Sequence, residues 1–581
     1  MLHKIMLALM LMLPRSCYAG PEAPVTPPPP PSYPWANGPP KSADFFPIAV
    51  WYQNPIAKLG GRYATVAEAV KGENMNIILG TAGSNGGGTP WPERFGSDDG
   101  ELAAVKKHDI YLIGAVTTPY DAVAPAPDSV ASILALIAKQ HADSSFIGYN
   151  IGDEPLCDST SMPPQMRINM VPTAVAGMTA KDPTRPVLDN FVFWPLIPQF
   201  PGTEACHADQ VAAANALGIV SFDLYAMTLP WYAAILKTGG SDFISVPNDA
   251  LFLQGLTVQA LFDNIPPGKP MWPFVESGTD NFGSSGSVSF MAASVAAGST
   301  TLTSNYDWTR FTRSWIGLTV TGPGIPKGAK IAAVTDAAHA VFDKAATATG
   351  EKVTVTIGGG GGAHNNNCVV SVNLCVVQGN EMRATSEEVN ASVWMTIIAG
   401  AHGIQYFCHD STDNSYCLGG QGTPGALAVQ ANLTHVNGNV LKFARVLNAR
   451  TLGMCSLRRI NSAIKQVTSG QWFTSESCHN GTVTLTTSDV AVPGRVLVKA
   501  GPDATYVLAQ SDVRAANGAT FGFTIAGLAG KTATVVYDSN DHYRTAHSQL
   551  GATHALDAAG KFSDQIGAFG SSYQVKIYRI G

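Results

Sequence analysis

Two glutamates stand at comparable places along the chain and have the chemistry needed for acid/base cleavage of a bond. Glu154 lies in the run YNIGDEP and Glu276 in the run WPFVESG, each at the end of a short apolar stretch typical of a buried strand. Hydrolysis of a glycosidic bond requires two carboxyl groups that face each other across it. One protonates the leaving oxygen, and the other attacks the sugar carbon or activates water. We therefore expect a functional site wherever the fold brings these two strand ends together.

The elements that must position these glutamates alternate between strands and helices from residue 44 onward. Eight strands are predicted over residues 46–52, 76–81, 110–117, 146–151, 187–193, 219–225, 271–276 and 404–408. Helical patterns occupy residues 65–74, 100–107, 129–141, 165–180, 207–217, 248–265, 386–399 and 436–447. Such alternation predicts an α/β fold with a parallel sheet, and eight units predict a (β/α)8 TIM barrel. A doubly wound open sheet is the alternative, but WYQNP stands where its glycine-rich phosphate loop would follow the first strand.

In a barrel, functional groups gather at the carboxyl ends of the strands, which here places Glu154 after the fourth and Glu276 after the seventh. This arrangement resembles clan A of the glycoside hydrolases, whose barrels carry an acid/base glutamate after strand four and a nucleophilic glutamate after strand seven. The likeness covers residues 44–450, with one interruption. It implies that Glu154 is the acid/base and Glu276 the nucleophile of a retaining enzyme.

Further positions share in this resemblance. Tyr225 matches an aromatic residue near strand six that often hydrogen-bonds the nucleophile, and Trp394 with the run GAHGI resembles the clan's approach to strand eight. Asp153 stands where the clan usually has an asparagine that contacts a sugar hydroxyl. The end of the second strand lacks the arginine that many members carry. These departures leave the family unassigned, while the resemblance still implies substrate-binding roles for Asp153 and Tyr225.

Flat aromatic side chains near strand ends are candidates for stacking against sugar rings. They are Trp51, Trp194, Trp231 and Trp272. The alternative for each tryptophan is ordinary packing in the barrel. The alternative for Asp153 is that it only accepts a hydrogen bond in a loop. His402, His409 and Asp410 do not form a compact metal-ligand motif, and we expect neither a metal nor another cofactor. A serine hydrolase is not favoured, because no Gly-x-Ser-x-Gly run follows a strand.

The length, the charge and the first residues of the chain indicate its domain number, its partners and its cellular location. The chain has 581 residues and a net charge of −6, without a long run of either sign. This length suggests two to four domains, and the lack of a basic stripe speaks against a nucleic-acid partner. Residues 1–19 have the positive start, short apolar run and small final residue of a signal peptide, and no later stretch is long and apolar enough to span a bilayer. We therefore expect a secreted or periplasmic protein.

The barrel is expected over residues 43–285 and 363–454. Three other segments differ from it in composition and in hydrophobic pattern. Residues 20–42 are proline-rich and predict an extended linker. Residues 286–362 alternate small, Thr- and Val-rich stretches with turns and end in glycines, which predicts a small all-β module inserted into the barrel. Residues 455–581 lose the helical pattern and predict a C-terminal β-sandwich.

Eight cysteines remain once the leader is removed, an even number that predicts disulfide bonds in an exported chain. They are Cys157, Cys206, Cys368, Cys375, Cys408, Cys417, Cys455 and Cys478. Unpaired buried thiols are the alternative, and the sequence does not determine the connectivity.

Two functions from different classes fit these observations. The first is hydrolysis of a polysaccharide or oligosaccharide by a retaining two-glutamate mechanism. The second is non-catalytic carbohydrate binding or surface attachment on the same scaffold, because one fold hosts many functions. The paired glutamates favour catalysis. The separation of their carboxyl groups distinguishes the cases, since about 5–5.5 Å indicates retention, roughly 6.5–9.5 Å inversion, and a wider gap binding alone.

Overall fold

The computed structural model describes most of the chain outside the leader. The described residues are 33–59, 62–80, 100–115, 143–155, 168–192, 204–224, 250–277, 287–304, 317, 319–335, 339–358, 367–369, 374–377, 384, 386–407, 424–461, 472–478, 483–489, 492–512, 517–568 and 573–581.

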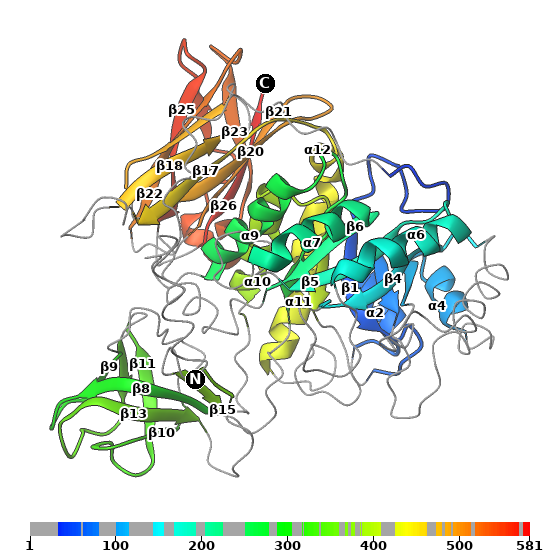
Figure 1. The fold of residues 1–581 in the computed structure, drawn as a ribbon. Coiled ribbons are helices and arrows are strands. Elements are labelled where there is room, and N and C mark those ends of the chain that lie inside the picture. The colour runs from blue at the N-terminus through cyan, green and yellow to red at the C-terminus, as the bar shows by residue number, and fades with distance from the viewer. Residues whose placement is uncertain are drawn as a thin grey trace.

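Eight parallel strands form the barrel (Figure 1). They are β1 (Ile48–Gln53), β2 (Ile77–Gly80), β3 (Tyr111–Ala115), β4 (Phe146–Asp153), β5 (Val187–Val192), β6 (Ile219–Asp223), β7 (Phe274–Glu276) and β16 (Ile404–Phe407). Their order is β6-β5-β4-β3-β2-β1-β16-β7. The ring closes just before β7, where Val220 pairs in parallel with Met271 and accepts a 2.8 Å hydrogen bond from the Trp272 amide. The predicted (β/α)8 barrel and its eight strands are thus confirmed.

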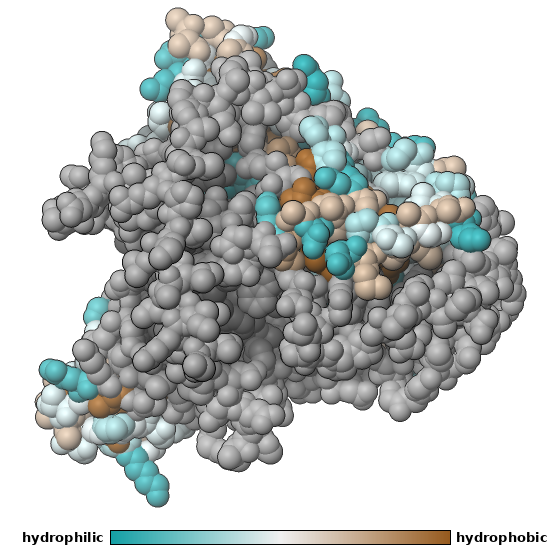
Figure 2. Space-filling view, viewed as in Figure 1, coloured by the Kyte–Doolittle hydropathy of each residue, from teal (hydrophilic) through white to brown (hydrophobic). Residues whose placement is uncertain are grey.

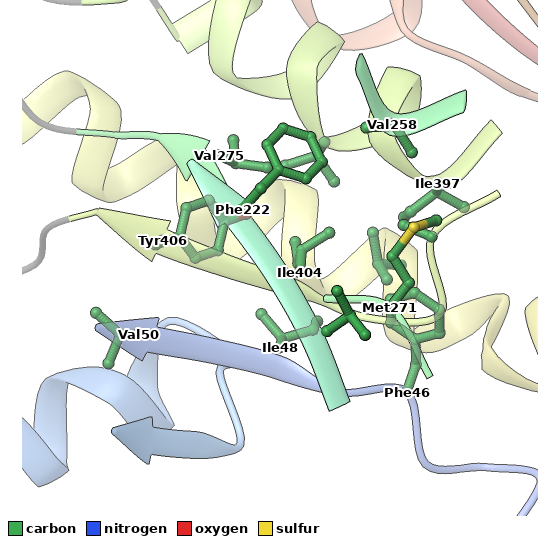
Figure 3. Close-up of a cluster of buried hydrophobic side chains, with 14 of the residues drawn as sticks. Phe46, Ile48, Val50, Phe222, Val258, Met271, Val275, Ile397, Ile404 and Tyr406 are labelled. Atoms are coloured by element: carbon green, nitrogen blue, oxygen red, sulfur yellow. The ribbon is translucent and has the colours of Figure 1, made fainter. Parts of the chain in front are cut away.

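Helices cover the outside of the barrel. They are α2 (Val66–Gly72), α4 (Glu101–Lys107), α6 (Val171–Lys181), α7 (Glu204–Ala216), α9 (Ala250–Asn264), α10 (Ser386–Ile398), α11 (Pro424–Lys442) and α12 (Ala444–Leu447). The expected helix over 129–141 lies outside the described residues, and α11 begins twelve residues before the expected start at 436. Side chains on the outer strand face, such as Ile48, Ile404 and Val275, pack with Val258 of α9 and Ile397 of α10 (Figure 3).

A second apolar cluster fills the barrel interior. It contains Ala49, Trp51, Ile77, Leu79, Ile113, Ile147, Leu188, Ile219, Trp272 and Phe274. One or more residues come from each of seven strands, and Trp272 lies just before β7. Alternate residues of a strand point to opposite faces, so this cluster marks which positions of each strand face inward.

Residues 33–45 belong to the base of the barrel rather than to a free linker. The Tyr33 hydroxyl accepts a 3.2 Å hydrogen bond from the Trp272 indole, and the Asn37 amide donates to the carbonyl of Thr184 at 2.9 Å. Trp35 packs closely against Gly38 and Gly218. A Cβ added at Gly38 would lie 2.9 Å from the Trp35 Cβ, and one added at Gly218 would lie 2.7 Å from the Trp35 ring. The expected linker over 20–42 therefore ends, in structural terms, before Tyr33.

The insertion forms its own antiparallel sheet. Its strands are β8 (Ser287–Val295), β9 (Thr301–Ser304), β10 (Thr319–Thr321), β11 (Ala329–Val334), β12 (His339–Phe342), β13 (Gly350–Gly358), β14 (Asn367–Val369) and β15 (Leu374–Val377). Strands β8 to β13 close on themselves, because β13 pairs with both β10 and β8. The β14–β15 hairpin adds to β8, so this sheet continues past the expected boundary at residue 362.

The C-terminal region is a two-sheet β-sandwich. One sheet has the order β18-β17-β20-β21-β26-β23-β24 and the other β19-β22-β25. Their bounds are β17 (Arg450–Asn461), β18 (Trp472–Cys478), β19 (Val483–Thr487), β20 (Gly494–Ala500), β21 (Thr505–Ser511), β22 (Asn517–Ile525), β23 (Thr532–Asp538), β24 (Thr553–Ala555), β25 (Lys561–Ala568) and β26 (Val575–Ile580). A short helix, α13 (Asn540–Tyr543), follows β23.

The sandwich packs on the helices α10 and α12, and Ser456 and Arg495 of the sandwich donate hydrogen bonds to Gln259 of α9 (Figure 1). The Gln510 amide donates to the carbonyl of Ala391 at 2.9 Å, and the Trp394 indole donates to the Tyr537 hydroxyl at 3.1 Å. These buried contacts fix the sandwich against the barrel, and β17 begins at Arg450, before the expected boundary at 455.

The surface of the described part is mixed in character. Ile56 and Leu550 are the exposed large hydrophobic side chains among the described residues. Figure 2 accordingly shows hydrophilic and weakly apolar residues interspersed over the barrel helices. Within the described chain, no helix is both long and apolar enough to cross a bilayer.

Candidate active site

Glu276 ends β7 on the inward face of the barrel. It stands two residues after Phe274, whose ring lies 5.1 Å from that of Trp51 in the interior cluster. The side-chain amide of Gln254 in α9 donates to the Phe274 carbonyl at 2.9 Å, and Glu276 pairs in register with Phe407 of β16. Glu276 is only 5 % exposed. The strand and its neighbours therefore hold this carboxyl group in a fixed, sheltered place at the carboxyl end of the barrel.

Glu154 directly follows β4 and has an unusual backbone. Its φ of +46° lies in the left-handed region, which non-glycine residues seldom adopt. The conformation is held by a 2.8 Å hydrogen bond from the Glu154 amide to the carbonyl of Asn190 on β5. The side chain is half-buried. Strained backbone of this kind is concentrated at functional sites, so the outlier points to this turn.

Asp153 joins three neighbouring strands through hydrogen bonds. Its Oδ1 accepts a 2.9 Å bond from the side-chain amide of Asn190, and the side-chain Oδ1 of Asn190 accepts a 3.2 Å bond from the Ser221 hydroxyl on β6. Asn190 and Ser221 stand two residues after Leu188 and Ile219, which both face the interior. The chain of contacts therefore lies at the inward-facing carboxyl ends of β4, β5 and β6.

Asp153 at this mouth has a raised pKa, and so has Asp189, which lies on the outer face of β5 between the inward-facing Leu188 and Asn190. Desolvation by the surrounding protein, together with the charge of Glu154, raises the pKa of Asp153 to about 7, although the Asn190 hydrogen bond opposes the shift and water reaches the side chain. Burial, aided by the charge of Asp153, raises the pKa of Asp189 well above its usual range. Asp153 therefore holds a proton at the mouth near neutral pH, the pH range in which acid/base catalysis needs one.

The structure adds residues that sequence reasoning missed. Asn190 and Ser221 both occupy inward positions near strand ends, as does the buried Asp223, which the sequence already places at the end of strand six. Asn190 is the most informative, because it contacts both Asp153 and the backbone of Glu154. Its signal in the sequence was weak, because Asn190 is one of two adjacent polar residues in an otherwise apolar strand.

Two predicted stacking residues have other roles. Trp272 is fully buried at the opposite, amino end of β7, where it contacts Tyr33. Trp51 is 3 % exposed and packs edge-on against Phe274 inside the barrel. Both rings are covered by the core, which leaves them no free face for a sugar, so the stacking prediction was wrong for these two. Tyr225, Trp194 and Trp231 lie outside the described residues.

The cysteines are described in part. Cys206 and Cys455 are disulfide-bonded. Cys455 lies directly opposite Cys478 in the β17–β18 register, and Cys368 lies opposite Cys375 across β14 and β15. Cys157, Cys408 and Cys417 lie outside the described residues. Pairing of all eight remains a prediction.

Among the described residues, no group of three or more His, Cys, Asp or Glu side chains is placed to hold a metal ion. His402 is buried at the base of the barrel, before β16. His409 and Asp410 lie outside the described residues.

Comparison with solved structures finds similar chains among carbohydrate-active enzymes. An alpha-amylase from Geobacillus thermoleovorans complexed with acarbose is 9% identical, with 93% of this chain and 98% of that chain covered at a TM-score of 0.42. A glucosidase from Croceicoccus marinus is 8% identical, with coverage of 94% and 97% and a TM-score of 0.36. An intracellular xylanase from Thermoanaerobacterium saccharolyticum is 14% identical, with coverage of 39% and 82% and a TM-score of 0.23.

No protein-family model matches the chain, and no curated protein matches it in sequence. At these identities and TM-scores, the likeness assigns neither a family nor an activity. The strand order and the polar mouth define the class directly: this chain is a (β/α)8-barrel protein with carboxyl groups at the carboxyl ends of β4 and β7.

Proposed function

We propose that this protein is a secreted glycoside hydrolase that cleaves O-glycosidic bonds of a polysaccharide or oligosaccharide with retention of configuration. One observation carries the proposal: Glu154 directly follows β4, and Glu276 ends β7 facing inward, so both lie at the carboxyl end of one closed barrel. Functional groups of such barrels gather at that end. The leader in residues 1–19 supports export to the periplasm or medium.

The two glutamates take different roles in this proposal. Glu154 protonates the glycosidic oxygen as the bond breaks, and the Glu276 carboxylate attacks the sugar carbon to form a glycosyl-enzyme. Glu154 then accepts a proton from water, which displaces Glu276 and releases the sugar. The rigid backbone around Glu276 supports its role as nucleophile, because attack requires a carboxylate held at a fixed position.

Asp153 and Asn190 support the acid/base residue. Asn190 fixes the Glu154 backbone through its carbonyl and the Asp153 side chain through its amide. Desolvation and the charge of Glu154 raise the pKa of Asp153, which favours a proton on Asp153 near neutral pH. This proton lies beside Glu154, the residue that acts as general acid in the proposal.

The first experiment is a screen of aryl glycosides and polysaccharides, followed by three variants on the best substrate. Glu276→Gln should abolish turnover. Glu154→Ala should lose less activity on substrates with good leaving groups than on others, because these need little protonation, and azide should increase its rate and yield a glycosyl azide. Glu351→Gln, which removes an exposed carboxylate on β13 of the inserted module, is the matched control and should turn over normally.

The stereochemistry of the azide product decides the mechanism. Azide that attacks the glycosyl-enzyme gives the retained configuration, which NMR of the anomeric proton reports. An inverted product would refute the retaining assignment, and undiminished activity of Glu276→Gln would refute the nucleophile. Binding of a polysaccharide without turnover of any substrate would instead support a carbohydrate-binding protein on this scaffold.

A further inference from the structure

A small cavity lies at the base of the barrel, where the C-terminal sandwich meets it. Phe262, Ile397 and His402 line it from the barrel side, and Thr451, Leu497 and Lys499 line it from β17 and β20. Its volume is about 10 Å³, which accommodates a single water-sized occupant. His402 precedes β16, so the cavity lies at the amino end of the barrel, opposite Glu154 and Glu276.

Lys499 brings a buried cation to this cavity. The residue is 5 % exposed, and its Nζ donates a 3.2 Å hydrogen bond to the carbonyl of Ala449. Among the described residues no carboxylate forms an ion pair with it. Burial lowers its pKa to about 8, which still leaves the amine largely protonated at neutral pH. A buried ammonium without a counter-charge is strongly unfavourable, so the site favours a negative occupant.

His402 contributes an unsatisfied polar atom. The side chain is 9 % exposed, its ring hydrogen-bonds to the backbone of Lys269, and its Nδ1 has no hydrogen-bond partner. Burial and the charge of Lys499 lower the pKa of His402 to about 3, so the ring is neutral while the cavity is unfilled. Buried polar atoms normally have partners, and an unpaired one signals an occupant.

We propose that this cavity binds one small monovalent anion of the halide class between Lys499 and His402. The lining is otherwise mainly apolar, so the counter-charge for the ammonium must come from the occupant. Sulfate and phosphate exceed this water-sized space by more than a halide does. A bound anion favours the protonated form of Lys499, whose ammonium supplies the opposite charge. The site joins the barrel to β20 and therefore acts on the docking of the sandwich, not on the chemistry at the mouth.

Bromide is a suitable probe because its anomalous scattering identifies it in a crystal. A crystal of the full chain grown in sodium bromide should show an anomalous peak within hydrogen-bond distance of Lys499 Nζ. Thermal unfolding should also be shifted upward by bromide relative to sodium sulfate at equal ionic strength, with a further rise for each tenfold increase in bromide, because ligands that bind only the folded state stabilise it. The shift should disappear above about pH 9, where Lys499 is deprotonated.

The matched variants are Lys499→Met and Lys531→Met. The first keeps the aliphatic stem and removes the buried charge, and should lose the bromide-specific shift. The second removes an exposed lysine of the same domain and should keep it. A cavity without an anomalous peak would overturn the proposal even if Lys499→Met fails to fold, because that measurement uses the unaltered protein. Equal unfolding temperatures in bromide and sulfate, or an undiminished shift in Lys499→Met, would overturn it too.

Discussion

The side-chain amide of Asn190 donates a 2.9 Å hydrogen bond to Asp153 Oδ1, and the Asn190 carbonyl accepts the Glu154 amide at 2.8 Å. One residue of β5 thus holds two consecutive acidic residues after β4. The Ser221 hydroxyl in turn donates to the Asn190 side chain at 3.2 Å, which extends the contact to β6. Because these bonds restrict both acidic residues, the orientation of Glu154 depends on a residue that contains no titratable group.

Replacing Asp153 with asparagine should change how stability depends on pH. The folded-state pKa of Asp153 is about 7 and its usual value is 3.8, so the folded protein binds more protons between these values than the unfolded chain. Stability from this group is therefore fully present below about pH 4 and is lost as the pH rises through 7. We expect Asp153→Asn to unfold at the wild-type temperature at pH 4 and at a higher temperature at pH 8.

The comparison with Asp557→Asn provides the control. Asp557 is an exposed residue of the sandwich whose pKa is lowered by hydrogen bonds from the Lys561 and Ala559 amides. Its stabilising effect is present above its usual pKa and is lost as the pH falls, so this variant should differ from wild type most at pH 8 and in the destabilising direction. Destabilisation of Asp153→Asn at pH 8 would contradict the raised pKa of Asp153.

Much of this architecture could be predicted from local sequence patterns. Each barrel strand is a short apolar run bounded by turns, which is why the eight strands and the end positions of Glu154 and Glu276 could be read directly. Trp272 could not be placed, because its burial depends on Tyr33, which lies 239 positions away in the chain. Asn190 escaped notice because its role depends on register with Asp153 across two strands, and an amide carries no obvious chemical signal.

The boundary of the insertion shows the same limit. The β14–β15 hairpin follows the glycine run that was expected to end the module, yet it pairs with β8 about 80 residues earlier, with Leu374 opposite Phe290. Only this non-local pairing assigns it to the module. Deleting residues 287–377 and joining the ends with a short Gly/Ser linker should therefore leave a barrel that unfolds cooperatively, because every strand pairing of this sheet lies within the deleted segment.

A shorter deletion of residues 286–357 is the matched comparison. It leaves β14 and β15 without β8, which exposes unpaired strand edges and should promote aggregation. Circular dichroism during thermal unfolding and light scattering measure the two outcomes. Loss of cooperative unfolding in the 287–377 deletion would mean that the module contributes to the barrel core.

Thiol titration of the denatured, unreduced mature protein should detect no free thiol. Cys206 and Cys455 are disulfide-bonded, and the opposed positions of Cys455 with Cys478 and Cys368 with Cys375 suit cross-strand bonds. An exported chain meets an oxidising environment in which such bonds persist. Two or more reactive thiols per chain would contradict complete pairing, and mass mapping of non-reduced peptides would identify the pairs.

The buried ion pair between Arg495 and Asp512 should be far more important for stability than the exposed pair between Arg579 and Asp503. Both have a 3.0 Å contact, but the first pair is 1 % and 0 % exposed and the second 43 % and 51 %. Arg495 also donates to Gln259 of α9 at 3.0 Å, so the buried pair connects the sandwich to the barrel.

Asp512→Ala leaves the Arg495 guanidinium buried without its carboxylate and should cost about 3–5 kcal/mol of unfolding free energy. Asp503→Ala removes the same chemical group from a solvent-screened pair and should destabilise the protein far less than Asp512→Ala. A double variant, Arg495→Met with Asp512→Leu, should recover much of the loss, because apolar residues of similar volume avoid the desolvation of both charges. Urea unfolding of all three variants measures these differences. If Asp512→Ala were no more destabilising than Asp503→Ala, the contact would not hold the sandwich on the barrel.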